Sequence, residues 1–149
     1  MIGIGVLVMQ HDRLVDPEWT AFMAKLEAAE HEFAQGRPAA FKALWSHDDQ
    51  VSLCGGFGGV VSGWDNVGAR LDWASSQISE GTRSREEIRS TVGADFAYIV
   101  QTEQIRFRVP GRAEQSTRDF RVTMVFRRDS DGWRIIHRHA DSQMGTRTP

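Results

Sequence analysis

Three side chains that could carry acid/base chemistry stand at alternate positions near the end of the chain: His137, His139 and Asp141. Residues 133–141 have the alternating pattern of a β-strand, in which every second side chain projects from the same face. An imidazole titrates near neutral pH, and a carboxylate can orient it, so His139 is the first candidate general base and His137 the second. The alternative is that these histidines form structural hydrogen bonds or close the mouth of a cavity.

The His-x-His pair also has suitable ligand types for a metal ion, together with Glu103 from an earlier segment. In cupin-like sites such a pair is followed by a further acid and histidine within an all-strand chain. Here His139 lies ten residues from the end of the chain and follows the predicted helices. We therefore expect no metal and no cofactor.

A glycine-rich turn, Gly-Gly-Phe-Gly-Gly at 55–59, follows a short apolar segment. It lacks the Gly-Lys-Ser/Thr ending of a phosphate-binding loop, so we do not expect it to bind phosphate. It instead predicts a hairpin whose backbone has positive φ angles or passes close to another segment of the chain. Phe57 within this turn is expected at the rim of a cavity. Cys54, the single cysteine, is interpreted as a small buried apolar residue, and its lack of a partner excludes a disulfide framework.

The elements that must position these residues are helices first and strands afterwards. Asp16-Pro17-Glu18 has the pattern of a helix start, and apolar residues then recur at helical spacing as far as Phe33. Further helices are predicted at 38–45 and 64–79, and the second of these carries Trp73 as a candidate cavity wall. Strands are predicted at 51–54, 60–61, 85–92, 96–109, 117–128 and 133–141. This order indicates an α+β fold with helices on one face of an antiparallel sheet.

The chain has 149 residues and a net charge of −2, which is typical of one globular domain. We expect an N-terminal extension at 1–15, a domain at 16–142 and a tail at 143–149. The apolar run at 2–9 is too short to span a membrane and lacks the basic start of a secretory signal, so a cytoplasmic protein without a membrane partner is expected. Arginines at 104–139 alternate with apolar residues and are interleaved with acids, which argues against nucleic-acid binding.

Five segments together resemble a known family. They are Ala-Ala-Phe-Lys-Ala-Leu-Trp-Ser-His at 39–47, the glycine turn with Phe57, Gly63-Trp64, Phe-Arg-Val-Thr at 120–123, and Gly-Trp-Arg-Ile-Ile-His-Arg-His-Ala-Asp at 132–141. Over residues 17–141 they are similar to the SnoaL-like and ketosteroid isomerase-like branch of the nuclear transport factor two-like superfamily. The resemblance implies a cone-shaped, cystatin-like fold, in which a curved antiparallel sheet wraps around the N-terminal helices and leaves a cavity.

The resemblance also implies which sheet face points into the cone. The inward set would be Ile99, Gln101, Glu103, Arg121, Thr123, Val125, Ile135, His137, His139 and Asp141. The outward set would be Tyr98, Val100, Phe120, Val122, Met124, Phe126 and Ile136, and this apolar convex face would form a homodimer. The residues alone also allow the reverse, in which Phe120, Val122, Met124 and Phe126 form an ordinary core and Arg121 faces water.

With the orientation that the resemblance implies, Glu103 and Arg121 join the histidines in one polar cluster. The pair could be a plain buried ion pair, or an unpaired Arg121 could bind a ligand carboxylate or enolate oxygen. The candidate catalytic residues are therefore His139, His137 and Asp141. The candidate ligand-binding residues are Arg121, Glu103, Thr123, Gln101, Ile99, Phe57 and Trp73.

Three positions depart from the pattern of the true ketosteroid isomerases. The catalytic base of those enzymes corresponds to about Gly55 here, and their two hydrogen-bond donors correspond to Thr123 and Ala29, so steroid isomerisation is not expected. The sequence predicts a protein that binds a small apolar molecule and catalyses cofactor-free acid/base chemistry such as isomerisation, hydration or cyclisation. The alternative is a noncatalytic ligand-binding or dimerisation module.

Overall fold

The computed structural model describes residues 16–142 and Gly145, so the predicted extension at 1–15 and most of the predicted tail at 143–149 lie outside the described residues. The first described helix, α2 (Pro17–Ala34), begins where the sequence predicts it. The Asp16 carboxylate accepts hydrogen bonds from the backbone N–H groups of Glu18 and Trp19, at 3.0 and 3.1 Å. These bonds satisfy two of the amide groups that a helix start leaves without partners.

Two further helices and a small hairpin follow α2. They are α3 (Ala39–Ala43), β1 (Ser52–Cys54), β2 (Val60–Ser62) and α4 (Trp64–Ser76). None of the described helices is long and apolar enough to cross a membrane.

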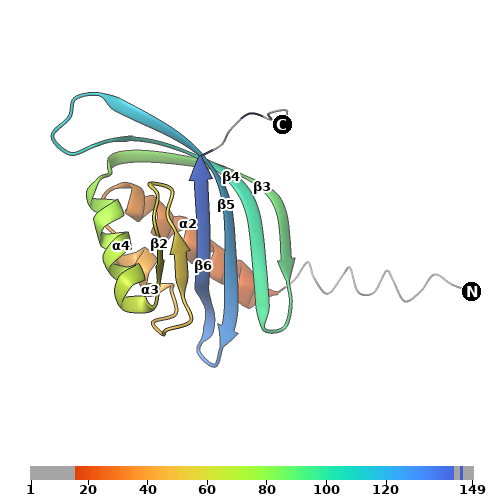
Figure 1. The fold of residues 1–149 in the computed structure, drawn as a ribbon. Coiled ribbons are helices and arrows are strands. Elements are labelled where there is room, and N and C mark those ends of the chain that lie inside the picture. Colours follow the sequence, from red (N-terminus) through yellow and green to blue (C-terminus); the bar gives the residue numbers. More distant parts are fainter. Residues whose placement is uncertain (1–15, 143–144, 146–149) are drawn as a thin grey trace, which may run out of the picture.

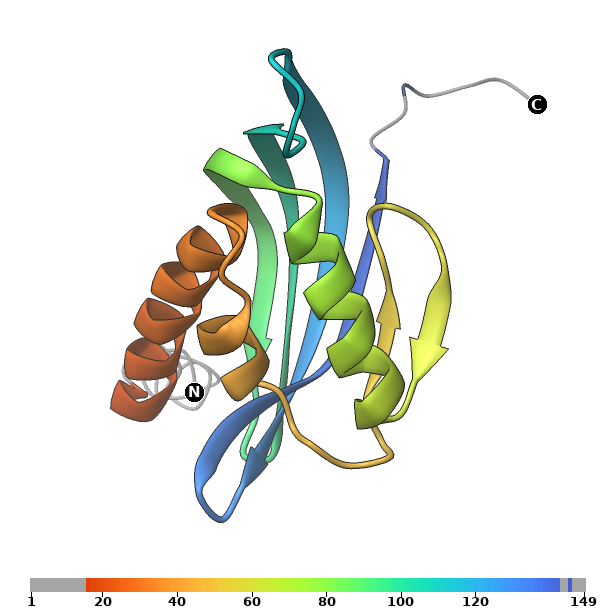
Figure 2. The same ribbon diagram turned by 90° about the vertical axis from the view of Figure 1, so that its left-hand side faces the viewer.

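The remainder of the described chain is a meander of four long strands. They are β3 (Ser79–Val92), β4 (Phe96–Arg108), β5 (Gln115–Asp129) and β6 (Gly132–Ser142). The six strands form one sheet in the order β2-β1-β6-β5-β4-β3, antiparallel except where β1 pairs with β6. The sheet is curved and unclosed, and the helices lie on its concave side (Figures 1 and 2). The predicted fold class is confirmed.

Strand β3 begins six residues before its predicted start, because Ser79–Arg85 is too polar to show a strand pattern. Gly81 allows the strand to pass close to the end of α2. A Cβ atom at Gly81 would lie 2.4 Å from the carbonyl oxygen of Ala34. Glycine is therefore required here by the close approach of two backbones.

The orientation expected for β5 is wrong. Phe120, Val122, Met124 and Phe126 are all buried on the concave side, between 0% and 7% exposed, so the Arg121 face of this strand is the outer one. The reverse orientation, which the residues alone allowed, is the observed one. The physical reason is that four large apolar side chains gain more from burial than the alternate set of Arg121, Thr123 and Val125.

Strand β6 contains a β-bulge that strict alternation could not anticipate. Phe126 pairs with Ile135, whereas Val125 pairs with His137, so Ile136 is an extra residue between them. The bulge inverts the alternation from this point. Ile135 faces inward as expected, but beyond the bulge Arg138 lines the interior, and the face that carries His137, His139 and Asp141 points outward.

Candidate functional site

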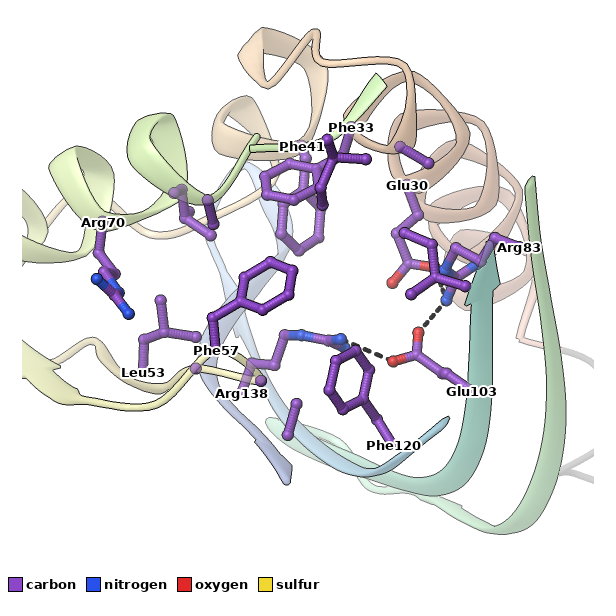
Figure 3. Close-up of a pocket in the computed structure, with 18 of the residues that line it drawn as sticks. Glu30, Phe33, Phe41, Leu53, Phe57, Arg70, Arg83, Glu103, Phe120 and Arg138 are labelled. Atoms are coloured by element: carbon purple, nitrogen blue, oxygen red, sulfur yellow. Dashed lines mark hydrogen bonds and ion pairs between the residues drawn. The ribbon is translucent and has the colours of Figure 1, made fainter. Parts of the chain in front are cut away.

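A cavity of about 110 Å³ lies between the helices and the concave side of the sheet (Figure 3). Its wall is largely aromatic and aliphatic, and Phe57 projects into its centre from the turn after β1. The apolar residues that line it are Phe33, Ala34, Phe41, Leu53, Phe57, Leu71, Trp73, Ala74, Ile78, Ile105, Phe120 and Ala140. An apolar cavity with a few convergent polar groups is the usual form of a small-molecule site.

The glycine turn allows the aromatic side chains to close around this cavity. A Cβ atom at Gly56 would lie 2.8 Å from the Phe120 ring, so only glycine lets that ring pack against the turn. The Phe57 ring packs edge-on against Trp73 and Phe120, with ring centroids 6.2 and 6.3 Å apart. Arg70 lies over the Trp73 ring at 4.0 Å and donates a hydrogen bond to the carbonyl of Gly58 at 2.9 Å.

The polar wall of the cavity is a network of four charged residues from four elements: Glu30 on α2, Arg83 on β3, Glu103 on β4 and Arg138 on β6. Arg83 forms ion pairs with both Glu30 and Glu103. Arg138 donates a hydrogen bond to the other oxygen of Glu103 at 2.7 Å. The Glu103 side chain is 3% exposed, so these pairs are shielded from water (Figure 3).

The two carboxyl groups of this network have opposite electrostatic environments. Burial raises the pKa of Glu30 to about 7, and the nearby Arg83 offsets this only in part. Burial also opposes ionisation of Glu103, but the guanidinium groups of Arg138 and Arg83 lower its pKa to about 2. Two carboxyl groups with separated pKa values can take different roles, one fixed as an anion and one able to exchange a proton near neutral pH.

Two buried polar atoms of the network have no hydrogen-bond partner among the described residues: Oε1 of Glu30 and Nη1 of Arg138. Buried polar atoms are nearly always paired, because an unpaired one destabilises the fold by about 1–3 kcal/mol. These atoms belong to side chains that line the cavity. They are therefore the groups most suited to bind the polar end of a ligand.

Three of the residues expected to bind ligand line this cavity, namely Glu103, Phe57 and Trp73. Ile99 and Gln101 also face inward on β4, where they are 1% and 2% exposed, but they do not line the cavity. The Gln101 side chain instead accepts a hydrogen bond from Arg85 at 3.3 Å.

The other five predicted site residues lie on the outer face of the sheet: Arg121, Thr123, His137, His139 and Asp141. The expected polar cluster of Glu103 with Arg121 and the histidines does not form, because Glu103 pairs with Arg83 and Arg138 on the opposite side of the sheet. Arg121 pairs with Asp141, at 2.8 and 3.0 Å, and its side chain is 60% exposed. Glu103 and the His-x-His pair therefore cannot ligate the same metal ion.

The sequence interpretation missed Glu30, Arg83 and Arg138. Only Glu30 gave a signal that could have been used: it follows Leu26 by one helical turn and precedes Phe33 by three residues, so it lies on the apolar face of α2. Arg83 lies in a polar segment without a pattern, and the β6 bulge conceals the inward direction of Arg138.

A family model for the SnoaL-like domain matches residues 22–144 of the sequence. The chain belongs to the SnoaL-like domain family. No curated protein matches the sequence of this SnoaL-like protein.

Among solved structures, this SnoaL-like protein is similar to a candidate dehydratase of the NTF2-like family from Streptomyces avermitilis. The two proteins are 20% identical in sequence over 86% of this chain and 95% of that chain, and their structures have a TM-score of 0.71. A ketosteroid isomerase-like protein from Erwinia carotovora atroseptica is 14% identical over 88% of this chain and 100% of that chain, with a TM-score of 0.70.

A third similar structure is a candidate calcium/calmodulin-dependent protein kinase type II association domain from Thiobacillus denitrificans. It is 19% identical over 84% of this chain and 94% of that chain, with a TM-score of 0.67. Likenesses at these identities show the shared fold and do not assign a role to this chain.

Proposed function

We propose that this SnoaL-like protein binds a small, largely apolar molecule that carries a carbonyl or hydroxyl oxygen, and transfers a proton at Glu30. The observation that carries the proposal is the unpartnered Oε1 of Glu30, a buried carboxyl group with a raised pKa on the wall of an apolar cavity. A candidate dehydratase and a ketosteroid isomerase-like protein among the similar structures agree with this class of chemistry.

The network provides each role that such a reaction needs. Ionised Glu30 accepts a proton from the carbon next to the carbonyl group, and the electron pair of that C–H bond moves to form an enolate. The unpartnered Nη1 of Arg138 binds the oxygen on which negative charge develops. Glu103 holds the guanidinium group of Arg138 in place by accepting a hydrogen bond from its other terminal nitrogen, Nη2. Return of the proton to a different carbon isomerises the substrate. Alternatively, the enolate re-forms the carbonyl group and expels a hydroxyl group two carbons away from it, which takes the proton from Glu30 and leaves as water.

The cavity restricts the size of the ligand. An apolar protein cavity of about 150 Å³ holds one benzene molecule. A cavity of about 110 Å³ therefore encloses no more than about one six-membered ring. A four-ring steroid would not be enclosed by it.

Deuterium exchange tests this proposal without knowledge of the natural substrate. A panel of monocyclic ketones is incubated with the protein in D₂O, and NMR measures deuterium at the carbon next to the carbonyl group. We expect the wild-type protein to catalyse exchange. Glu30→Gln should slow the exchange by at least about 100-fold, which is the contribution that a general base makes to a rate. Glu114→Gln, a matched change in the exposed turn after β4, should leave the rate unchanged.

The pH profile provides an independent check on the role of Glu30. Only the ionised carboxylate accepts a proton, and the pKa of Glu30 is about 7, so the exchange rate should rise as pH increases from 6 to 8. Glutamine resembles the protonated acid in shape and charge, so Glu30→Gln should fold, as circular dichroism would show. Absence of exchange by the wild-type protein, or full activity in Glu30→Gln, would exclude proton transfer at this residue.

A noncatalytic binding or dimerisation module is the second candidate, because the same fold occurs in a candidate kinase association domain. The two functions differ in a measurable way. A binding module would shift the Trp73 and Phe57 NMR signals on addition of a ring ketone without exchanging its protons. An enzyme would show both effects.

A further inference from the structure

Three metal-ligating side chains meet on the outer face of the sheet, away from the cavity. Cys54 comes from β1, and His137 and His139 come from the neighbouring strand β6. In the strand register Cys54 lies opposite His139, and Ser52 lies opposite His137. One ligating atom from each of the three side chains lies within 4.8 Å of the other two.

The chemistry of these groups suits a particular class of cation. A thiolate with two imidazoles is a ligand set for zinc, whose tetrahedral sites accept sulfur at about 2.3 Å and nitrogen at about 2.0–2.1 Å. Two ligands bound to the same zinc ion are then about 3.3–3.7 Å apart. The observed spacing of up to 4.8 Å needs only small side-chain rotations to reach this geometry.

The structure also orients one of the imidazoles. The Ser52 hydroxyl is hydrogen-bonded to Nδ1 of His137 at 2.7 Å. If Nδ1 carries the proton, the lone pair of Nε2 is directed away from Ser52 and is free to bind a cation. Metal-binding histidines commonly have such a partner on their second nitrogen, because it fixes the tautomer and the ring orientation.

The carboxylate of Asp141 adds negative charge beside the cluster, since its Oδ2 lies 3.8 Å from Nε2 of His139. Two hydrogen bonds from Arg121 hold this carboxylate in place, at 2.8 and 3.0 Å. Asp141 is therefore engaged by Arg121, and three protein ligands leave the fourth tetrahedral position for water.

We propose that Cys54, His137 and His139 bind one zinc ion per chain on the outer face of the sheet. This inference revises the expectation of no metal, and it does not depend on the proposed function of the cavity. The bound ion joins Cys54 on β1 to His137 on β6, which lies more than 80 residues further along the sequence. A ligand that binds only the folded state raises its stability, so zinc should also raise the melting temperature.

Cobalt(II), which takes the same tetrahedral geometry and has visible d–d bands, is the probe for the test. The full chain without an affinity tag is titrated with cobalt chloride under reducing conditions, and absorbance spectra are recorded. We expect a thiolate-to-cobalt charge-transfer band that saturates at one cobalt per chain and disappears when zinc is added. Because the chain has a single cysteine, such a band assigns the thiolate to Cys54.

Matched variants separate this site from adventitious binding. Cys54→Ser should remove the charge-transfer band, and His139→Gln should weaken zinc binding by at least about 10-fold. Ser52→Ala, which keeps all three ligands, should weaken zinc binding by about 10-fold through loss of the oriented imidazole. His31→Gln, a change at an exposed histidine of α2, should have no effect.

Stability supplies the second measurement. Zinc should raise the melting temperature of the wild-type protein and of His31→Gln, but not that of Cys54→Ser. Absence of the charge-transfer band in the folded wild-type protein would overturn the proposal. So would unchanged zinc binding in a His139→Gln variant that circular dichroism shows to be folded.

Discussion

At the scale of single residues, Arg83 is the centre of the polar wall, because it contacts both Glu30 and Glu103. We predict that Arg83→Met lowers the free energy of unfolding by about 3 kcal/mol, since it leaves buried carboxyl groups without their shared cation. Arg121→Met is the matched control, because it removes an arginine from a solvent-exposed pair with Asp141 and should lower the free energy of unfolding far less. Urea unfolding at neutral pH measures both, and equal losses would contradict the assigned difference in burial.

The same scale shows what sequence reasoning could recover of the site. It found Glu103, Phe57 and Trp73 as candidates, and all three line the cavity. It passed over Glu30, since an acid in a helix is usually solvated and only its place beside Leu26 and Phe33 indicates burial. The separation of the two carboxyl pKa values depends on which arginine each meets, and no spacing in the sequence contains that information.

At the scale of the elements, the crossing of β3 over the end of α2 depends on Gly81. We predict that Gly81→Ala lowers the free energy of unfolding by about 1–3 kcal/mol, because the added methyl group meets the Ala34 backbone at 2.4 Å. Gly145→Ala, where nothing lies within 4 Å, should change it by less than about 0.5 kcal/mol. Thermal unfolding compares the two variants, and a neutral Gly81→Ala would mean that the strand and helix separate at little cost.

Hydrophobic periodicity predicted most of the helices and strands and their order, because burial of one face imposes a spacing on each element. It failed at two places where local geometry overrides spacing. The start of β3 is polar, and the bulge at Ile136 inverts the alternation of β6. A single unpaired residue thus moved His137, His139 and Asp141 from the expected inner face to the outer one.

At the scale of the whole molecule, the residues expected to form the homodimer interface are buried in the core: Phe120, Val122, Met124 and Phe126. A homodimer through the convex face must therefore use other apolar residues. Phe96 and Tyr98 on β4 are 56% and 40% exposed, and they supply apolar surface on the outer side of the sheet.

We predict that native mass spectrometry shows a dimer, and that the double variant Phe96→Asp/Tyr98→Asp shows a monomer, because paired carboxylates would be costly to bury. Arg112→Asp, in the exposed turn after β4, should leave the dimer intact. If the wild-type protein is a monomer, the convex face of the sheet does not form a dimer interface.

The bulge in β6 has a consequence for how such a protein can evolve. Insertion or loss of one codon at this position exchanges the entire set of side chains that the rest of the strand presents to the interior. Arg138 and Ala140 would change places with His137, His139 and Asp141 in one genetic event. A lineage can therefore acquire a new set of groups in its cavity in one step, without a series of point substitutions.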